Sequence, residues 1–380
     1  MLIISITIFF FVIYACLILY YRQSWLSIPS FSFQRIDESA PVTFISVIIP
    51  ARNEEVNIEA CLTSVTNQSY LKALFEVIVV DDFSTDRTAA IIKSFSAKNV
   101  SLISLKDYAQ DGKLNSYKKR AIEIAISKAK GDLIVTTDAD CIVPYNWLYT
   151  IAGFYEKYKP AFIAAPVSYF GENNFLKIFQ SLDFMTLQGI TGAAVSKKFH
   201  NMCNGANLAY EKKSFSEVDG FAGIDNIASG DDMLLMHKIY NRYPERVLFL
   251  KSADAIVHTK PAETLGNFLN QRIRWSSKAD KYSDKKITAV LVLVYFFNIW
   301  ILFLAIASFF SFSSFKTFLL LLLSKTIIEL FFLYPVARFF KKEKMLFWFP
   351  VAQPFHVLYT VIAGWLGKFG SYKWKERKVK

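Results

Sequence analysis

The stretch Asp132-Leu-Ile-Val-Thr-Thr-Asp138-Ala-Asp140-Cys141 places two carboxylates directly after an apolar, β-branched run. Because the run over residues 132–137 has no helical period, it predicts a buried strand of an α/β sheet. Aspartates at the end of such a strand face the crevice where open α/β sheets bind ligands. Their oxygens suit Mg²⁺ or Mn²⁺, ions usually shared with substrate phosphates. A solvated turn is the alternative, because Asp is a common turn residue.

Strands and helices alternate around this stretch. Apolar runs predict strands over residues 45–49, 76–80 and 100–105, and helical patterns cover residues 54–67 and 117–130, the latter helix being basic on its surface. The alternation predicts a parallel, doubly wound sheet. No glycine-rich dinucleotide motif or P-loop occurs, so a nucleotide would have to bind through other groups.

A second acidic pair is expected at the same sheet edge. Asp81 and Asp82 end the predicted strand 76–80, so parallel strands would bring them beside Asp138 and Asp140. Two acidic clusters at one edge favour a nucleotide site built from carboxylates over two chance turns.

The composition indicates a protein that is partly soluble and partly embedded in a membrane. Of 380 residues, 53% are hydrophobic and 20% are charged, which is too apolar for an ordinary soluble protein and too polar for a membrane bundle. The net charge is +12, and many basic residues flank apolar runs, as at membrane boundaries. No basic stripe interleaved with aromatics occurs in the middle of the chain, which argues against nucleic acid as a partner. The four cysteines form no CxxC pair, which predicts reduced thiols and no zinc site.

Four apolar segments are long enough to cross a bilayer. They are residues 2–21, 287–310, 317–337 and 345–366. Arg22 and Arg35 follow the first segment, which by the positive-inside rule places the middle of the chain in the cytoplasm. Pro350 and Pro354 weaken the last segment and favour a kink or a re-entrant course. We expect a multi-pass protein of the inner or plasma membrane whose α/β domain lies in the cytoplasm.

The segments predict five regions. They are an N-terminal transmembrane anchor (1–22), a linker (23–43), a cytoplasmic α/β domain (44–284), a region with two or three transmembrane helices (285–368) and a basic tail (369–380). Lys325 and Glu329 are expected to neutralise each other one turn apart, the alternative being an ion pair that faces a lipid-substrate cleft. Residues 173–189 fit either an interfacial or a core helix.

Further motifs follow along the chain. The sequence contains Ser46-Val-Ile-Ile-Pro-Ala-Arg-Asn-Glu-Glu55, Val77-Ile-Val-Val-Asp-Asp-Phe-Ser-Thr-Asp-Arg-Thr88, Thr137-Asp-Ala-Asp140, Ser229-Gly-Asp-Asp-Met-Leu-Leu235 and Gln271-Arg-Ile-Arg-Trp275. In this order they resemble the inverting family 2 glycosyltransferases, whose GT-A nucleotide-sugar-binding domain has a doubly wound mixed sheet. The last motif matches the family's Gln-x-x-Arg-Trp element without a change. Asp231 stands where the family has Glu, so its role beside the substrate is open.

The resemblance implies how a sugar-nucleotide donor would be held. Asp82 would hold the base, and Pro50 and Glu54 would lie near the nucleotide. Asp138 would face the ribose or the metal. Asp140 would bind the Mg²⁺ or Mn²⁺ that bridges the donor's diphosphate.

The resemblance also implies how an acceptor would be activated. Asp232 would be the general base that takes the proton of the acceptor hydroxyl, which is a poor nucleophile without one. Gln271, Arg274 and Trp275 would close over the diphosphate and the acceptor, and Gly205 would let the backbone approach a ligand. A simple acidic pair at a helix N-terminus is the alternative for Asp232 and its neighbour. A surface helix with Trp275 buried and both arginines solvated is the alternative for the Gln-x-x-Arg-Trp element.

The expected function is transfer of a sugar, most simply from a UDP-sugar, to a lipid or lipid-linked acceptor at the cytoplasmic face of the membrane. A small processive polysaccharide synthase and a non-catalytic membrane scaffold that retains the fold are the alternatives. A transporter would need many spans with polar residues inside them, which the sequence lacks.

Overall fold

The computed structural model describes residues 1–32, 40–108, 116–225, 227, 230–277, 284–370, 372–374 and 377–379. The chain divides into two compact units. The α/β unit comprises Pro29–Phe170 and Asn201–Lys260, and the helical unit comprises Met1–Ile28, Gly171–His200 and Pro261–Lys380. Arg35, Ser229, part of the predicted linker and most side chains of the predicted basic tail lie outside the described residues.

The α/β unit is built on a seven-stranded sheet with the order β3-β2-β1-β4-β7-β5-β8. The strands are β1 (Ile45–Ala51), β2 (Phe75–Asp81), β3 (Val100–Ser104), β4 (Leu133–Thr136), β5 (Phe162–Ala164), β7 (Leu208–Glu211) and β8 (Val247–Phe249). The first four in this order are parallel, as predicted. Strand β7 pairs antiparallel with both β4 and β5, in agreement with the mixed sheet that the family resemblance implies. The sheet is therefore mixed.

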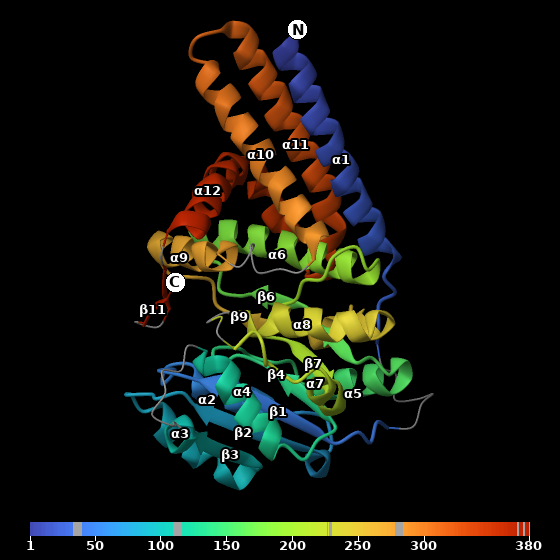
Figure 1. The fold of residues 1–380 in the computed structure, drawn as a ribbon, viewed down its shortest axis with the longest axis vertical. Helices are drawn as coiled ribbons and strands as arrows, with labels where there is room; N and C mark the ends of the chain where they lie inside the picture. Colours follow the sequence, from blue (N-terminus) through green and yellow to red (C-terminus); the bar gives the residue numbers. More distant parts are fainter. Residues whose placement is uncertain are drawn as a thin grey trace. The chain divides into compact units, whose positions relative to one another are not determined.

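Helices pack against this sheet and complete the α/β unit (Figure 1). They are α2 (Ile58–Thr66), α3 (Thr88–Ser94), α4 (Tyr117–Lys128), α5 (Trp147–Tyr158), α7 (Lys212–Glu217) and α8 (Asp231–Arg242), and a small parallel sheet joins β6 (Val167–Tyr169) to β9 (Val257–Thr259). Helix α2 begins four residues later than predicted, because the backbone N–H of Glu54 donates to Thr88 Oγ1 (2.8 Å) and residues 54–57 form a turn.

The centre of the sheet is fully buried and apolar, as its β-branched sequence requires. Val47, Val79 and Val135 have no exposed surface. Gly131 precedes β4 where the chain passes very close to β1. A Cβ there would lie 2.5 Å from Ser46 N, so only glycine fits.

Among its described residues, the helical unit contains four helices that are long and apolar enough to cross a membrane. They are α1 (Leu2–Ser27), α10 (Lys285–Ala307), α11 (Phe312–Phe339) and α12 (Phe349–Phe369), the last preceded by a 3₁₀ turn at Glu343–Trp348. Helices α1, α10 and α11 run side by side, and α12 lies against the half of α10 that is far from the α10–α11 turn (Figure 1). The predicted pairing inside α11 is confirmed, because Lys325 Nζ lies 2.7 Å from Glu329 Oε1.

Two further helices cross one end of this bundle (Figure 1). They are α6 (Phe175–Ser196) and α9 (Leu265–Ser276), and a short hairpin of β10 (Tyr372–Trp374) and β11 (Arg377–Val379) follows α12. Gly189 of α6 lies directly against Phe332 and Val336 of α11, where a Cβ would meet Val336 Cγ2 at 2.6 Å. This packing fits the core alternative for residues 173–189.

Candidate functional site

The two acidic clusters lie at one edge of the sheet of the α/β unit, as predicted. Strand β1 pairs in parallel with both β2 and β4, so the carboxyl ends of β2 and β4 flank the end of β1. Asp81 ends β2 and Asp82 follows it, whereas Asp138 and Asp140 follow β4 by two and four residues. The open edge between them is where ligands of such sheets bind.

Asp82 is held by the loop after β1. Its backbone N–H donates to Ala51 O (2.8 Å), and Arg52 Nη1 donates to Asp82 O (2.7 Å) and lies 3.8 Å from its carboxylate. Asp82 is only 3% exposed, so its orientation is fixed before any ligand arrives. Pro50 lies in β1, and Glu54 accepts a hydrogen bond from Asn57 Nδ2 (2.9 Å) in the turn that follows.

Lys118 of α4 joins the acidic residues that follow β4 to those that begin α8. Its Nζ lies 2.9 Å from Asp138 Oδ1 and 3.1 Å from Asp231 Oδ2. Burial lowers the pKa of Lys118, but the negative charges of Asp138 and Asp231 outweigh burial and raise it above the ordinary value. Lys118 is therefore a fixed cation between two carboxylates.

The expectation that the basic residues of the 117–130 helix face solvent is wrong for Lys118 and Lys119. Lys119 is 2% exposed and donates to the carbonyl oxygens of Ile224 and Ile227 (2.6 Å each). The helix periodicity alone carried no signal for this, because the positions of the acids and carbonyls depend on packing of distant segments.

Asp232 stands at the N-terminus of α8 with both carboxylate oxygens engaged. Its Oδ2 accepts from Gly205 N (3.0 Å) and its Oδ1 accepts from Met233 N (2.7 Å). A Cβ on Gly205 would lie 3.3 Å from Lys118 Nζ and 3.6 Å from Asp231 Oδ2. Gly205, Lys118, Asp231 and Asp232 thus form one cluster, which we call the lysine cluster. The acidic pair does begin a helix, as in the simpler alternative, but its two members have different partners.

Asp138 and Asp140 are suited to a hard divalent ion. They are half-buried and flank buried Ala139, and the nearby thiols of Cys61 and Cys141 are buried. Burial and the charges of the two aspartates raise the pKa of both thiols, and a hard divalent ion prefers carboxylate oxygen to thiol sulfur. Within the described ranges, no group of three or more His, Cys, Asp or Glu side chains is placed to hold a metal. Two carboxylates fit an Mg²⁺ or Mn²⁺ ion whose other ligands are substrate phosphates and water.

Gln271, Arg274 and Trp275 belong to α9 of the helical unit. Thr264 caps this helix by accepting from Asn267 N (3.2 Å). The alternative of a surface helix with both arginines solvated is wrong for Arg272, which is 4% exposed. Gln271 Oε1 accepts from Arg272 Nη1 (2.9 Å), and the Trp275 ring lies beside Phe184 of α6.

The chain is similar to known glycosyltransferases. Residues 133–366 match the family described as glycosyl transferase family group 2, and residues 46–219 match glycosyl transferase family 2. Over 110 residues the chain is 38% identical to the glycosyltransferase AglE of Haloferax volcanii, a match of 29% of this chain and 34% of the relative. Over 118 residues it is 31% identical to the dolichyl N-acetyl-alpha-D-glucosaminyl phosphate 3-beta-D-2,3-diacetamido-2,3-dideoxy-beta-D-glucuronosyltransferase of Methanococcus voltae, a match of 31% of this chain and 36% of the relative. The chain thus spans about a third of each relative's length.

A solved structure shares the fold. The mannosyltransferase PcManGT of Pyrobaculum calidifontis, in complex with GDP-Man and Mn²⁺, covers 94% of this chain and 97% of its own at a TM-score of 0.56 and 18% identity. This likeness confirms the GT-A fold that the sequence motifs predicted.

Proposed function

Because the chain belongs to glycosyl transferase family group 2, we propose that it transfers a sugar from a nucleotide-diphosphate sugar to a lipid or lipid-linked acceptor with inversion at the anomeric carbon. We take the donor to be a UDP-sugar, the ion to be Mg²⁺ or Mn²⁺, and the α/β unit to face the cytoplasm of a cell membrane. The four apolar helices support the membrane location. The relative named for a dolichyl-linked acceptor supports the acceptor class, and the neighbour solved with Mn²⁺ supports the ion.

The lysine cluster is the observation that carries the proposal. In the proposed site, Asp82 would receive the nucleotide base, with Pro50 and Glu54 nearby, and Asp138 and Asp140 would hold the divalent ion. When bound, the ion would neutralise charge on the leaving group. Lys118 contacts Asp138 on the donor side and Asp231 on the acceptor side.

Asp232 is the proposed general base. The N–H groups of Gly205 and Met233 hold its carboxylate in one orientation, so that an acceptor hydroxyl placed at the free lone pairs would pass its proton to it. The hydroxyl oxygen bonds to the anomeric carbon as the bond from that carbon to the diphosphate oxygen breaks, which inverts the centre. Gln271, Arg274 and Trp275 of α9 are proposed to close over the diphosphate and the acceptor, with the guanidinium of Arg274 facing the phosphate charge.

The test uses the full chain in lipid nanodiscs with a membrane lipid extract. A panel of UDP- and GDP-sugars is offered with Mn²⁺ or Mg²⁺, and nucleoside diphosphate release and labelled lipid are measured. We expect turnover of one donor, and a loss of about 10²-fold or more in Asp232→Asn. Asp107→Asn is the matched control, because Asp107 is an exposed aspartate of the same unit. Full activity in Asp232→Asn would overturn the base assignment, and no turnover with any donor would favour the scaffold.

A further inference from the structure

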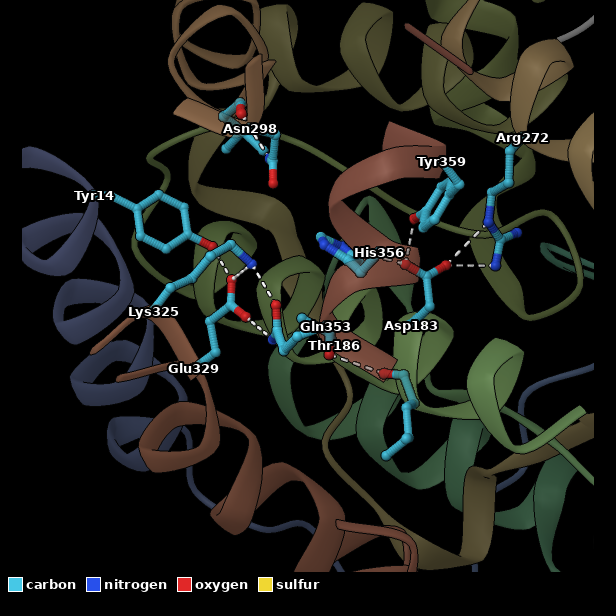
Figure 2. A network of polar contacts seen from close by, with 12 residues as sticks. Tyr14, Asp183, Thr186, Arg272, Asn298, Lys325, Glu329, Gln353, His356 and Tyr359 are labelled. Carbon is cyan, nitrogen blue, oxygen red and sulfur yellow. Dashed lines mark hydrogen bonds and ion pairs between the residues drawn. The ribbon is translucent and has the colours of Figure 1, made fainter. Parts of the chain in front are cut away.

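Asp183 of α6 is the centre of a buried polar cluster in the helical unit (Figure 2). Arg272 of α9 donates to Asp183 Oδ2 from both Nε (3.0 Å) and Nη2 (2.6 Å), and each side chain is only 4% exposed. Tyr359 of α12 donates to Asp183 Oδ1, and His356 Nε2 lies 3.8 Å from the same oxygen. One carboxylate thus joins three helices.

Arg272 also contacts the first and the last residue of the motif, Gln271 and Trp275. Its Nη1 donates to Gln271 Oε1 (2.9 Å), and its guanidinium carbon lies 4.3 Å from the centre of the Trp275 ring. The same guanidinium lies 4.8 Å from the ring of Phe268. With its oxygen engaged by Arg272, the amide of Gln271 presents its N–H groups as donors, which suit phosphate oxygens.

A buried ion pair of this kind is not the simplest way to stabilise a helix contact. Well-packed apolar residues are often as stable, because two charges must be desolvated to form the pair. Two hydrogen bonds from Nε and Nη2 to the one oxygen Oδ2 fix the plane of the guanidinium, and this plane in turn fixes the amide of Gln271 and the ring of Trp275. The geometry therefore points to an orienting role.

Resting on the function proposed above, we propose that Asp183 and Arg272 are positioning residues that hold Gln271 and Trp275 in the orientation needed for transfer. Arg272 occupies the first x of the Gln-x-x-Arg-Trp pattern, where the pattern specifies no residue, and in this chain it orients the site residues. Tyr359 anchors Asp183 from α12 and completes the arrangement.

A second buried cluster of the same unit provides a matched control (Figure 2). Lys325 Nζ donates to Glu329 Oε1 (2.7 Å) and to Gln353 Oε1 (2.8 Å), and Tyr14 donates to Glu329. This cluster joins α1, α11 and α12 and is also buried. Loss of Lys325 perturbs the helical unit without removing a bond to α9.

The first test is a double-mutant cycle on the full chain in nanodiscs. We expect Arg272→Met to lower kcat for transfer by about tenfold or more and the loss to be smaller in Arg272→Lys, which keeps the positive charge. In the Gln271→Ala background the same change should cost much less, because Arg272 acts through its neighbours. The proposal would be overturned if the kcat losses of Arg272→Met and Gln271→Ala multiplied in the double mutant. It would also be overturned if Lys325→Met lowered kcat as much as Arg272→Met does.

The second test does not depend on turnover. Hydrogen exchange of the α9 amides should become at least several-fold faster in Asp183→Asn and Arg272→Met but not in Lys325→Met. Unchanged α9 exchange in the first two variants would overturn the positioning role even if no donor were found. If the variants show this exchange pattern while the wild-type protein turns over no donor, the proposed function is refuted but the positioning role is not.

Discussion

Replacing Lys118 by Met should destabilise the α/β unit by about 1 to 3 kcal/mol. Because Asp138 Oδ1 and Asp231 Oδ2 both contact Lys118 Nζ, they lie within about 6 Å of each other, and their repulsion at an effective dielectric constant of 20 is roughly 3 kcal/mol. The Asp138 side chain is 36% exposed, so water screens part of this repulsion. The lower half of the predicted range of about 1 to 3 kcal/mol allows for this screening.

Calorimetry of the full chain in nanodiscs measures the effect on the transition of the α/β unit. A loss of about 2 kcal/mol corresponds to a fall of roughly 4 to 8 °C for a unit of this size. Mn²⁺ should raise the transition temperature more in Lys118→Met than in the wild type, because a bound cation restores the missing positive charge beside Asp138. Arg120→Met is the control, since Arg120 is on the same helix in an exposed pair with Glu123 (3.4 Å). It should cost less than about 0.5 kcal/mol.

The pH dependence of this difference has a definite sign. The pKa of Lys118 is raised in the folded protein, so its contribution is complete below the unfolded value of about 10.4 and is lost only as pH rises toward the folded value. The stability difference between wild type and Lys118→Met should therefore stay constant from about pH 6 to pH 9. Equal stability of the two proteins, or an identical Mn²⁺ response, would refute the bridging role.

Three further predictions concern other parts of the structure. Asn207, fully buried, accepts from an indole N–H and donates to two carbonyls, so Asn207→Ala should lower the stability of the α/β unit by about 2 to 4 kcal/mol, measured by calorimetry. Gly131→Ala should lower the stability of the α/β unit by about 1 to 3 kcal/mol in the same assay, because the new Cβ would lie 2.5 Å from a backbone nitrogen. Burial raises the pKa of Glu172, but hydrogen bonds from Lys342 and Ser181 outweigh it and lower the pKa. Glu172→Gln should thus destabilise the helical unit at pH 7, and in thermal melts from pH 7 to 3 the difference should begin to shrink only below the unfolded value of about 4.3, as pH falls toward the lower folded value.

The parallel half of the sheet could be predicted from sequence because its signals are local. Uninterrupted apolar runs of β1, β2 and β4 are typical of strands covered on both faces, and the acids that follow β2 and β4 necessarily meet at one edge. The position of β7 could not be predicted in this way. Its pairing with β4 joins residues more than 70 positions apart, and no periodicity records which distant edge a strand will choose.

The residues that sequence reasoning missed are cations that turn inward. Lys118 and Arg272 lie on helices whose patterns suggest solvated basic faces, yet each meets a carboxylate from a distant part of the chain. The sequence does not predict whether a long basic side chain points to solvent or to the interior, because its direction depends on where its acidic partner lies in the fold. The motif residues were easier to identify, since their resemblance to a family does not depend on knowing the packing.

The place of β7 between β4 and β5 also affects how the protein is made. During synthesis, residues 45–136 emerge before residues 208–211 and contain the four parallel strands, so the edge of β4 has no partner until residues 208–211 have left the ribosome. That edge is apolar, with Ile134 and Val135 buried in the finished sheet, and an open apolar edge invites pairing between nascent chains. The site acids after β4 thus exist well before Gly205 and Asp232 can join them. We therefore expect the nascent chain to be most prone to aggregation while the roughly 70 residues between β4 and β7 are translated, when a chaperone bound to the unpaired edge of β4 would protect it most.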